Sequence, residues 1–232
     1  MSKAGPQFAA CDSIRIVIPG RSAHGSMPPN AIDPTYTAAM IITRMQAIVG
    51  REVDPNDFAV ISVGTMRAGS VTNIIPASAE LTLNCRFYSD KTKEKVCASI
   101  ERVVHAEVLA SGMTEKPTIE YFAHGELLTN DAIVYRKVRP TFDAVFGKDS
   151  VNAPRKTVSE DFPFIPMAFG VPYFFWLIGC TPREQWDVAV AADRVAEDVP
   201  VNHMANFLPD YEPTINAATR AAAAAVLTYL AG

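Results

Sequence analysis

The order of predicted elements in the first half of the chain constrains the fold more than any other feature of the sequence. Residues 12–123 carry a strand, a helix, two strands, a second helix and a last strand. In the strand of residues 79–87 apolar and polar side chains alternate, and both helices have apolar residues on one side only. This order predicts a ferredoxin-like α+β domain, in which one antiparallel four-stranded sheet has both helices on a single face.

Local signals place the boundaries of these elements. The strands are expected at residues 13–18, 58–66, 79–87 and 118–122, and the helices near 33–49 and 90–110. Asp33 followed by Pro34 is typical of an N-cap and a first helical position, and Asp90 is predicted to cap the second helix. Residues 69–76 are predicted to connect the second strand to the third.

The second half of the chain has a different character. A helix is predicted over residues 131–146, and an alanine-rich helix from about 214 to 230. Between them, residues 173–178 are almost wholly apolar, which predicts a strand in a sheet covered on both faces, as in α/β layers. Because one or two strands do not make such a sheet, we expect part of an α/β domain whose other strands lie outside the chain.

Composition and charge exclude several classes of function. The 232-residue chain has 21 basic and 25 acidic residues and a net charge of -4, without a long run of either sign, so neither a nucleic-acid nor a membrane partner is expected. It has no apolar signal core at its start and no run of about 18 apolar residues. Its four cysteines are widely spaced without a C-x-x-C pair, as is typical of reduced thiols. These features predict a cytoplasmic protein and leave a small, uncharged or anionic organic substrate open.

His24 is the residue whose position most strongly indicates a function. It lies in a loop rich in glycine, serine and proline, residues 20–28, between a predicted strand and the helix start at Asp33. A histidine in such a loop has no packing role, so it is predicted to contact a ligand. The alternative is a surface histidine on a mobile turn.

Four short motifs in the chain carry a resemblance to a known family. They read GRSAHGS at residues 20–26 with DP at 33–34, NIIP at 73–76, SEDF at 159–162, and VNH at 201–203 followed by Phe207. With these motifs in this order, the chain resembles the zinc-dependent metallopeptidase family of aminoacylases, hippurate hydrolases and auxin-conjugate amidohydrolases. The resemblance implies hydrolysis of the amide bond of N-acyl amino acids or related conjugates.

The resemblance also implies a domain organisation. The family has a catalytic α/β domain that holds two metal ions, zinc or alternatively manganese, cobalt or nickel. A ferredoxin-like lid interrupts that domain, and two subunits form a homodimer through the lid. Residues 12–123 are expected to be the lid, and residues 124–232 the C-terminal part of the catalytic domain.

Four residues receive expected roles from the resemblance. His203 is similar to a metal ligand, because a neutral imidazole suits zinc; without the motif, a histidine that caps or packs near a helix start is the simpler interpretation. His24 is similar to a lid histidine that reaches the neighbouring subunit's active site and stabilises the oxyanion formed as water adds to the amide carbonyl. Asn73 resembles an asparagine that hydrogen-bonds the substrate, with a turn-shaping residue as the alternative. Glu160 matches a position near the metal site, with capping of the next turn beside Asp161 as the alternative.

Three further residues have simpler interpretations. His105 is predicted on a helix surface, and His124 at the joint between the two domains. Arg86 lies on the polar side of its strand with Glu80, which favours a cross-strand ion pair; a clamp for a substrate carboxylate is the alternative.

The family takes its other metal ligands and its carboxylate base from a region before the lid. The chain contains no adjacent Glu-Glu pair and no histidine near Cys11. Because catalytic zinc usually has three protein ligands, His203 alone is not expected to retain the metal. We therefore expect a C-terminal fragment of an amidohydrolase that is inactive by itself. The alternative is a non-catalytic dimerisation or binding module, or one half of a split enzyme.

Overall fold

The computed structural model describes residues 1–230, and their contacts divide the chain into two compact units. The sheet unit comprises Pro6–Thr129 and Arg155–Gly170, and the helical unit comprises Met1–Gly5, Asn130–Pro154 and Val171–Gly232. The assignment of residues 12–123 as a lid and 124–232 as catalytic stays a prediction.

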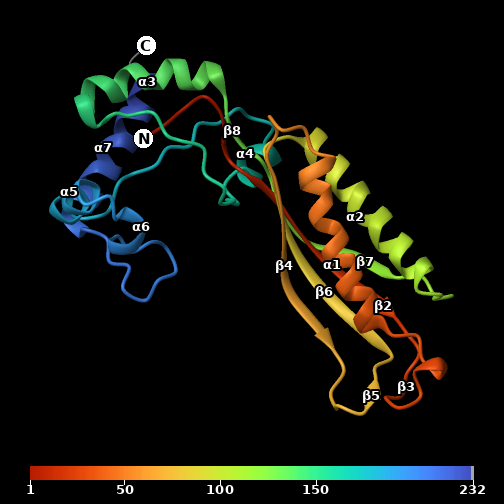
Figure 1. Ribbon diagram of the computed structural model, residues 1–232. Helices are drawn as coiled ribbons and strands as arrows, with labels where there is room; N and C mark the ends of the chain where they lie inside the picture. The colour runs from red at the N-terminus through yellow and green to blue at the C-terminus, as the bar shows by residue number, and fades with distance from the viewer. Residues whose placement is uncertain (231–232) are drawn as a thin grey trace. The chain divides into compact units, whose positions relative to one another are not determined.

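The sheet unit contains the four-stranded antiparallel sheet that the element order predicts. Its strands lie in the order β4-β6-β2-β7, and they are β2 (Ala10–Pro19), β4 (Ala59–Ala68), β6 (Ser78–Phe87) and β7 (Thr118–Gly125). The helices α1 (Pro34–Arg51) and α2 (Asp90–Ala110) lie together on one face of the sheet (Figure 1). The ferredoxin-like prediction is confirmed.

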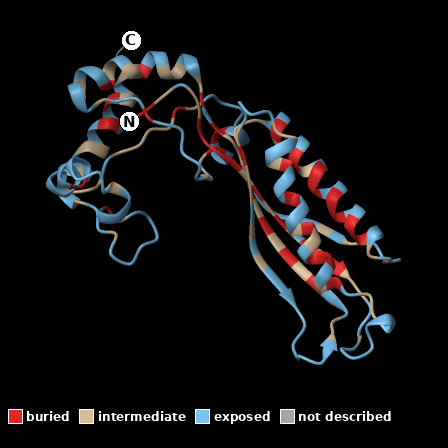
Figure 2. Ribbon diagram, in the orientation of Figure 1, coloured by how far each residue is buried: buried red, intermediate tan, exposed pale blue. Residues whose placement is uncertain are grey.

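Alternation along the strands explains why both helices pack on the same face. Ile14, Ile16 and Ile18 of β2 are fully buried, whereas Arg15 between them is exposed. Figure 2 shows the buried residues along the strands and on the sides of the helices that face them. Full burial of such a side chain contributes about 1.5–3 kcal/mol, so these positions fix which face of the strand turns inward.

The helix ends follow local side-chain chemistry. Asp33 caps α1 as predicted, since its Oδ1 accepts hydrogen bonds from the backbone N–H of Thr35 at 2.8 Å and of Tyr36 at 3.4 Å. The prediction that Asp90 caps α2 is wrong. Ser89 is the cap, because its backbone is extended and its Oγ accepts from the N–H of Thr92, while Asp90 is already helical.

The segment of residues 155–170, which includes α4 (Phe164–Ala168), packs within the sheet unit. The N–H of Ala9 donates to the carbonyl oxygen of Val158 at 3.0 Å. Gly125 permits this close approach, because a Cβ atom there would lie 2.9 Å from Cys11 Sγ and 3.4 Å from Ser159 Cβ.

The helical unit packs around a small aromatic cluster. Its helices are α3 (Ala132–Phe146), α5 (Arg183–Ala191), α6 (Val195–Asp198) and α7 (Tyr211–Leu230). Phe142 of α3 lies 5.8 Å from Phe174 and 5.4 Å from Trp176 between ring centroids, and Ala221 and Ala224 of α7 complete the cluster. The alanines let α7 approach α3 closely. No helix within residues 1–230 is long and apolar enough to cross a membrane.

The predicted strand at residues 173–178 is not formed, and this prediction is wrong. The segment is extended, but its backbone bonds go to scattered partners instead of a neighbouring strand. The side chain of Asn130 accepts from the N–H of Phe175 at 2.6 Å and donates to its carbonyl oxygen at 2.9 Å. The N–H of Leu177 donates to the carbonyl oxygen of Met1 at 2.8 Å. A side-chain amide thus takes the place that a strand would occupy in a ladder.

A short ladder joins two strands outside the four-stranded sheet. It pairs β1 (Gly5–Phe8) with β8 (Leu128–Asn130). A second short ladder lies within the sheet unit and pairs β3 (Ala23–His24) with β5 (Ile74–Ile75), so the predicted connection at residues 69–76 contains a strand.

Candidate functional site

His24 lies in a loop that several backbone contacts hold in place. His24 pairs with Ile74 in the ladder of β3 and β5, and the N–H of Gly25 donates to the carbonyl oxygen of Asn73 at 2.7 Å. The hydroxyl of Ser22 donates to the carbonyl oxygen of Ile75 at 2.8 Å. The structure therefore brings the segments of two predicted site residues, His24 and Asn73, side by side.

Glycine at position 25 eases this approach. A Cβ atom there would lie 3.3 Å from the carbonyl oxygen of Asn73, tighter than an ordinary contact. The side chains of His24 and Asn73 are both exposed, so neither is held by core packing. Two polar side chains thus face solvent, one from β3 and one from the turn just before β5.

The imidazole of His24 has partners at one nitrogen. Nδ1 lies 2.7 Å from Ser26 Oγ and accepts the backbone N–H of Ser26 at 3.1 Å. Within residues 1–230 no hydrogen bond to Nε2 is found. The ring is thereby oriented while one nitrogen remains open to a ligand. Ser26 belongs to the same GRSAHGS motif, but no role was predicted for it.

Glu160 lies in the loop that packs against the sheet unit. Its Oε1 accepts the backbone N–H of its neighbour Asp161 at 3.0 Å, and the side chain is partly buried. The preceding Ser159 accepts a hydrogen bond from Arg86 Nη1 at 3.1 Å and one from Cys11 Sγ at 3.2 Å. Arg86 therefore reaches the loop of Glu160.

The cross-strand ion pair favoured for Arg86 is not found within residues 1–230, and that prediction is wrong. Glu80 binds Arg15 Nη2 at 2.6 Å, whereas Arg86 donates to Asn84 Oδ1 and to the carbonyl oxygen of Thr157. The two residues are six positions apart on one strand, which separates them by roughly 20 Å. Sharing a face of a strand is not sufficient for contact at that separation.

His203 lies in the helical unit, in the loop before α7, and its side chain is exposed. Its φ of 73° is in the left-handed region, which non-glycine residues seldom adopt. Such backbone conformations occur preferentially at functional sites, where the surroundings hold them. No group of three or more His, Cys, Asp or Glu side chains that could hold a metal ion is found among residues 1–230.

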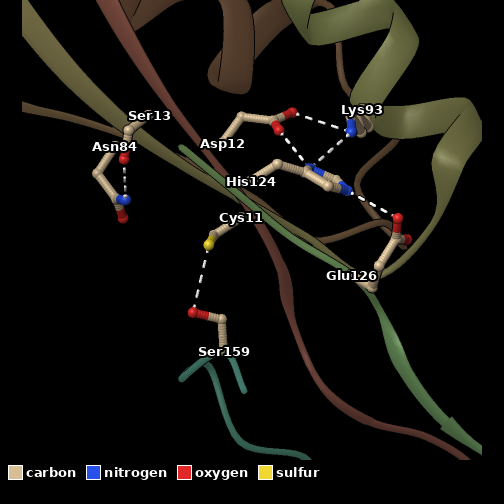
Figure 3. A network of polar contacts seen from close by, with 8 residues as sticks. All are labelled: Cys11, Asp12, Ser13, Asn84, Lys93, His124, Glu126 and Ser159. Atoms are coloured by element: carbon tan, nitrogen blue, oxygen red, sulfur yellow. Dashed lines mark hydrogen bonds and ion pairs between the residues drawn. The ribbon is translucent and has the colours of Figure 1, made fainter. Parts of the chain in front are cut away.

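A polar network that sequence reasoning missed lies at the start of β2 (Figure 3). His124 Nδ1 lies 2.7 Å from Asp12 Oδ1, and His124 Nε2 lies 3.0 Å from Glu126 Oε1. Lys93 Nζ pairs with Asp12 Oδ2 at 3.2 Å. His124, predicted to lie at the joint between the two domains, is surrounded by three charged groups, those of Asp12, Lys93 and Glu126.

A sequence signal for this network did exist. Asp12 falls on the same face of β2 as Ile14 and Ile16, and its side chain is only 4% exposed. A buried carboxylate needs partners, because burying an unpaired charge is strongly unfavourable. The alternation of β2 could therefore have predicted that Asp12 needs a cationic partner, which the structure identifies as Lys93 and His124.

Carboxylates at both ring nitrogens favour the charged form of His124. Burial lowers its pKa, but the hydrogen bonds to Asp12 and Glu126 outweigh that effect, and the pKa is raised from 6.5. A neutral ring would turn a lone pair toward one of the two carboxylates. The network therefore binds a proton more tightly in the folded protein than in the unfolded chain.

We expect His124 to make folding stability depend on pH. Because the folded pKa is above the unfolded value, the stabilisation is fully present below about pH 6.5 and is lost as pH rises through the folded pKa. The side chain is 37% exposed and solvent screens it, so we expect about 1 kcal/mol or less. Urea unfolding at pH 6 and pH 9 should show a smaller decrease in His124→Gln than in the unsubstituted protein. His105→Gln, at an exposed helix position, is the control, and an equal decrease in His124→Gln would contradict the assignment.

The four cysteines are free thiols, as predicted. Cys85 is fully buried in the core, whereas Cys11, Cys97 and Cys180 are only partly buried. Burial raises the pKa of Cys85 to about 12, so this thiol is unreactive near neutral pH.

Comparisons with known proteins match both halves of the chain. Residues 12–111 match the peptidase dimerisation domain. The chain is 30% identical over 184 residues to an N-acetylcysteine deacetylase from Bacillus subtilis, which covers 79% of this chain and 47% of that protein. It is 37% identical over 113 residues to a hippurate hydrolase from Campylobacter jejuni, covering 46% of this chain and 30% of that protein. The chain thus spans about half the length or less of these curated relatives.

Solved structures extend the likeness of fold to nearly the whole chain. A dinuclear metal-binding peptidase of the M20 family from Bacillus subtilis aligns with a TM-score of 0.69 at 23% identity. The alignment covers 98% of this chain and 52% of that chain.

Proposed function

The chain belongs to the M20 peptidase family, and we propose that it acts in a metal-dependent amidohydrolase that cleaves the amide bond of N-acyl amino acids or related conjugates. The observation that carries the proposal is the His24 loop, which is bonded to the Asn73 segment and leaves Nε2 open. The deacetylase and hydrolase activities of the relatives support the same bond type.

His24 would act on charge that develops during the reaction. When water adds to an amide carbonyl, its oxygen becomes negatively charged, and an N–H donor aimed at that oxygen stabilises the transition state more than the substrate. The imidazole can supply this donor from Nε2, because Nδ1 is bonded to Ser26. Asn73, in the turn just before β5, would hydrogen-bond the substrate.

Arg86 is the proposed contact for the carboxylate of an N-acyl amino acid. It uses Nε and Nη1 for contacts with Asn84, Thr157 and Ser159, so its plane is fixed by the protein. Nη2, which makes none of these contacts, can then donate to a carboxylate oxygen from a fixed position, and such a charge-assisted hydrogen bond is stronger than a neutral one. Its contact with Ser159 also places it beside the loop of Glu160, for which we propose a role near the metal centre.

The described residues do not by themselves fit a dinuclear metal centre. We propose His203 as one ligand, because an exposed imidazole on a left-handed loop residue suits coordination. Since residues 1–230 gather no group of three candidate ligands, the other ligands and the carboxylate base would come from additional polypeptide. Zinc is the proposed metal, with manganese, cobalt or nickel as alternatives.

Dimerisation is part of the proposal, because it would bring His24 to a neighbouring site. The sheet ends in β4 on one side and β7 on the other, and the edge strands β4 and β7 have backbone groups that a second copy can continue across a two-fold axis. The match of residues 12–111 to a peptidase dimerisation domain supports this arrangement.

The test compares the purified chain with the same chain co-expressed with the N-terminal half of the N-acetylcysteine deacetylase relative. With zinc and an N-acetyl amino acid, we expect no hydrolysis by the chain alone and hydrolysis by the co-expressed pair, because only the pair has enough ligands to hold the metal. Zinc-stimulated hydrolysis by the chain alone would contradict the proposed need for further ligands. Hydrolysis in neither preparation would favour the alternative, a non-catalytic dimerisation or binding module.

A further inference from the structure

The two contacts at His24 Nδ1 differ in what they indicate about which ring nitrogen carries the hydrogen. The hydroxyl of Ser26, 2.7 Å from Nδ1, is able to donate or accept. The backbone N–H of Ser26, 3.1 Å from the same nitrogen, is only able to donate. A nitrogen that accepts a backbone N–H must present a lone pair, so a hydrogen on Nδ1 would oppose this contact.

We propose that Ser26 is a positioning residue whose backbone N–H and hydroxyl hold the neutral His24 ring in the tautomer with its hydrogen on Nε2. In that tautomer both Ser26 groups donate to the Nδ1 lone pair, and Nε2, the nitrogen without a protein partner among residues 1–230, becomes a donor. In the other tautomer Nε2 would carry a lone pair and repel a negatively charged oxygen.

The loop is built to keep Ser26 in place. The N–H of Met27 donates to the carbonyl oxygen of His24 at 2.8 Å, which closes a turn around Ser26. The N–H of Gly25 is fixed to Asn73, and Arg21 Nε donates to the carbonyl oxygen of Asn30 at 2.8 Å. Because these bonds hold the turn on both sides, the N–H of Ser26 points at His24 Nδ1 although no core packing holds it there.

The functional meaning of this tautomer rests on the proposed function. An oxyanion needs a donor, so the Nε2–H tautomer is the reactive one, and Ser26 would raise its population before substrate arrives. The tautomer itself is a property of the folded chain. Measuring it needs neither metal nor substrate, so failure of the proposed activity and failure of this inference give separate results.

The experiment is long-range ¹H–¹⁵N correlation of the histidine side chains at a pH where the rings are neutral. The four histidines are assigned with single substitutions, and His105, exposed on α2, is the internal reference. We expect the Nε2–H to Nδ1–H ratio of His24 to exceed that of His105 by roughly fivefold, the factor that corresponds to about 1 kcal/mol for a net hydrogen bond.

Three variants separate the contributions of the loop. Ser26→Ala removes the hydroxyl but keeps the N–H, so the ratio should decrease in part. Ser26→Pro removes both donors, so the ratio should decrease to that of His105. Ser22→Ala, which loses only the bond to Ile75 in the same loop, should leave the ratio unchanged. A His24 ratio equal to that of His105 in the unsubstituted protein, or one insensitive to both Ser26 variants, would overturn the inference.

Discussion

An amidase-active preparation that carries His24→Ala is expected to lose roughly a hundredfold in kcat, about 3 kcal/mol, while keeping its bound metal. The reason is that His24 is proposed to stabilise charge that exists only in the transition state. His203→Ala should lose both metal and activity, because it removes a ligand. Metal content by elemental analysis beside kcat distinguishes the two variants. Depleted metal in His24→Ala with full occupancy in His203→Ala would show that the two roles are reversed.

The substitution His203→Asn tests whether loss of metal at position 203 comes from the missing imidazole or from backbone strain. His203 has a φ of 73°, and asparagine tolerates this conformation better than alanine does. His203→Asn should therefore fold as well as the unsubstituted protein and still lose metal. If His203→Asn keeps its metal, His203 is not a ligand.

Mixing the two inactive variants tests whether His24 acts across a dimer. If His24 serves the partner's site, a dimer of one His24→Ala and one His203→Ala subunit has one site with both histidines. Random pairing then restores up to about a quarter of the original activity. If His24 serves its own subunit, every site lacks one histidine and no activity returns.

Phe87→Ala is expected to lower the free energy of unfolding by about 3–5 kcal/mol. Phe87 is fully buried at the end of β6, where it lies opposite Ala10 and Ala59, and these small neighbours cannot fill the space that a lost ring leaves. Urea unfolding followed by far-ultraviolet circular dichroism measures the change.

Two controls locate this effect in the sheet unit. Phe169→Ala removes the same ring from a side chain that is 77% exposed, so it should change stability by less than about 0.5 kcal/mol. Both tryptophans, Trp176 and Trp186, lie in the helical unit, so their fluorescence reports on that unit separately. An effect of Phe87→Ala no larger than that of Phe169→Ala would contradict the assignment of Phe87 to the core.

Much of the sheet unit was predictable because its information is local and periodic. Ile14, Ile16 and Ile18 define a face with a period of two, and α1 and α2 each have one apolar side, so only one layered arrangement buries all three surfaces. The wrong prediction of a strand at residues 173–178 also came from local information. Apolar side chains make a segment suited to burial, but a strand also needs a neighbouring backbone, and here the side chain of Asn130 occupies that position.

The sequence by itself determined the ferredoxin-like order, the Asp33 cap and the loop position of His24, because each depends on residues close together in the chain. Tertiary structure decided which distant groups meet. The bond from Gly25 to Asn73, the contact of Arg86 with Ser159 and the proton-binding network of Asp12, Lys93 and His124 all join residues separated by tens of positions. Strand register and loop packing set these contacts, and a register is fixed only when the whole hydrophobic face is buried at once.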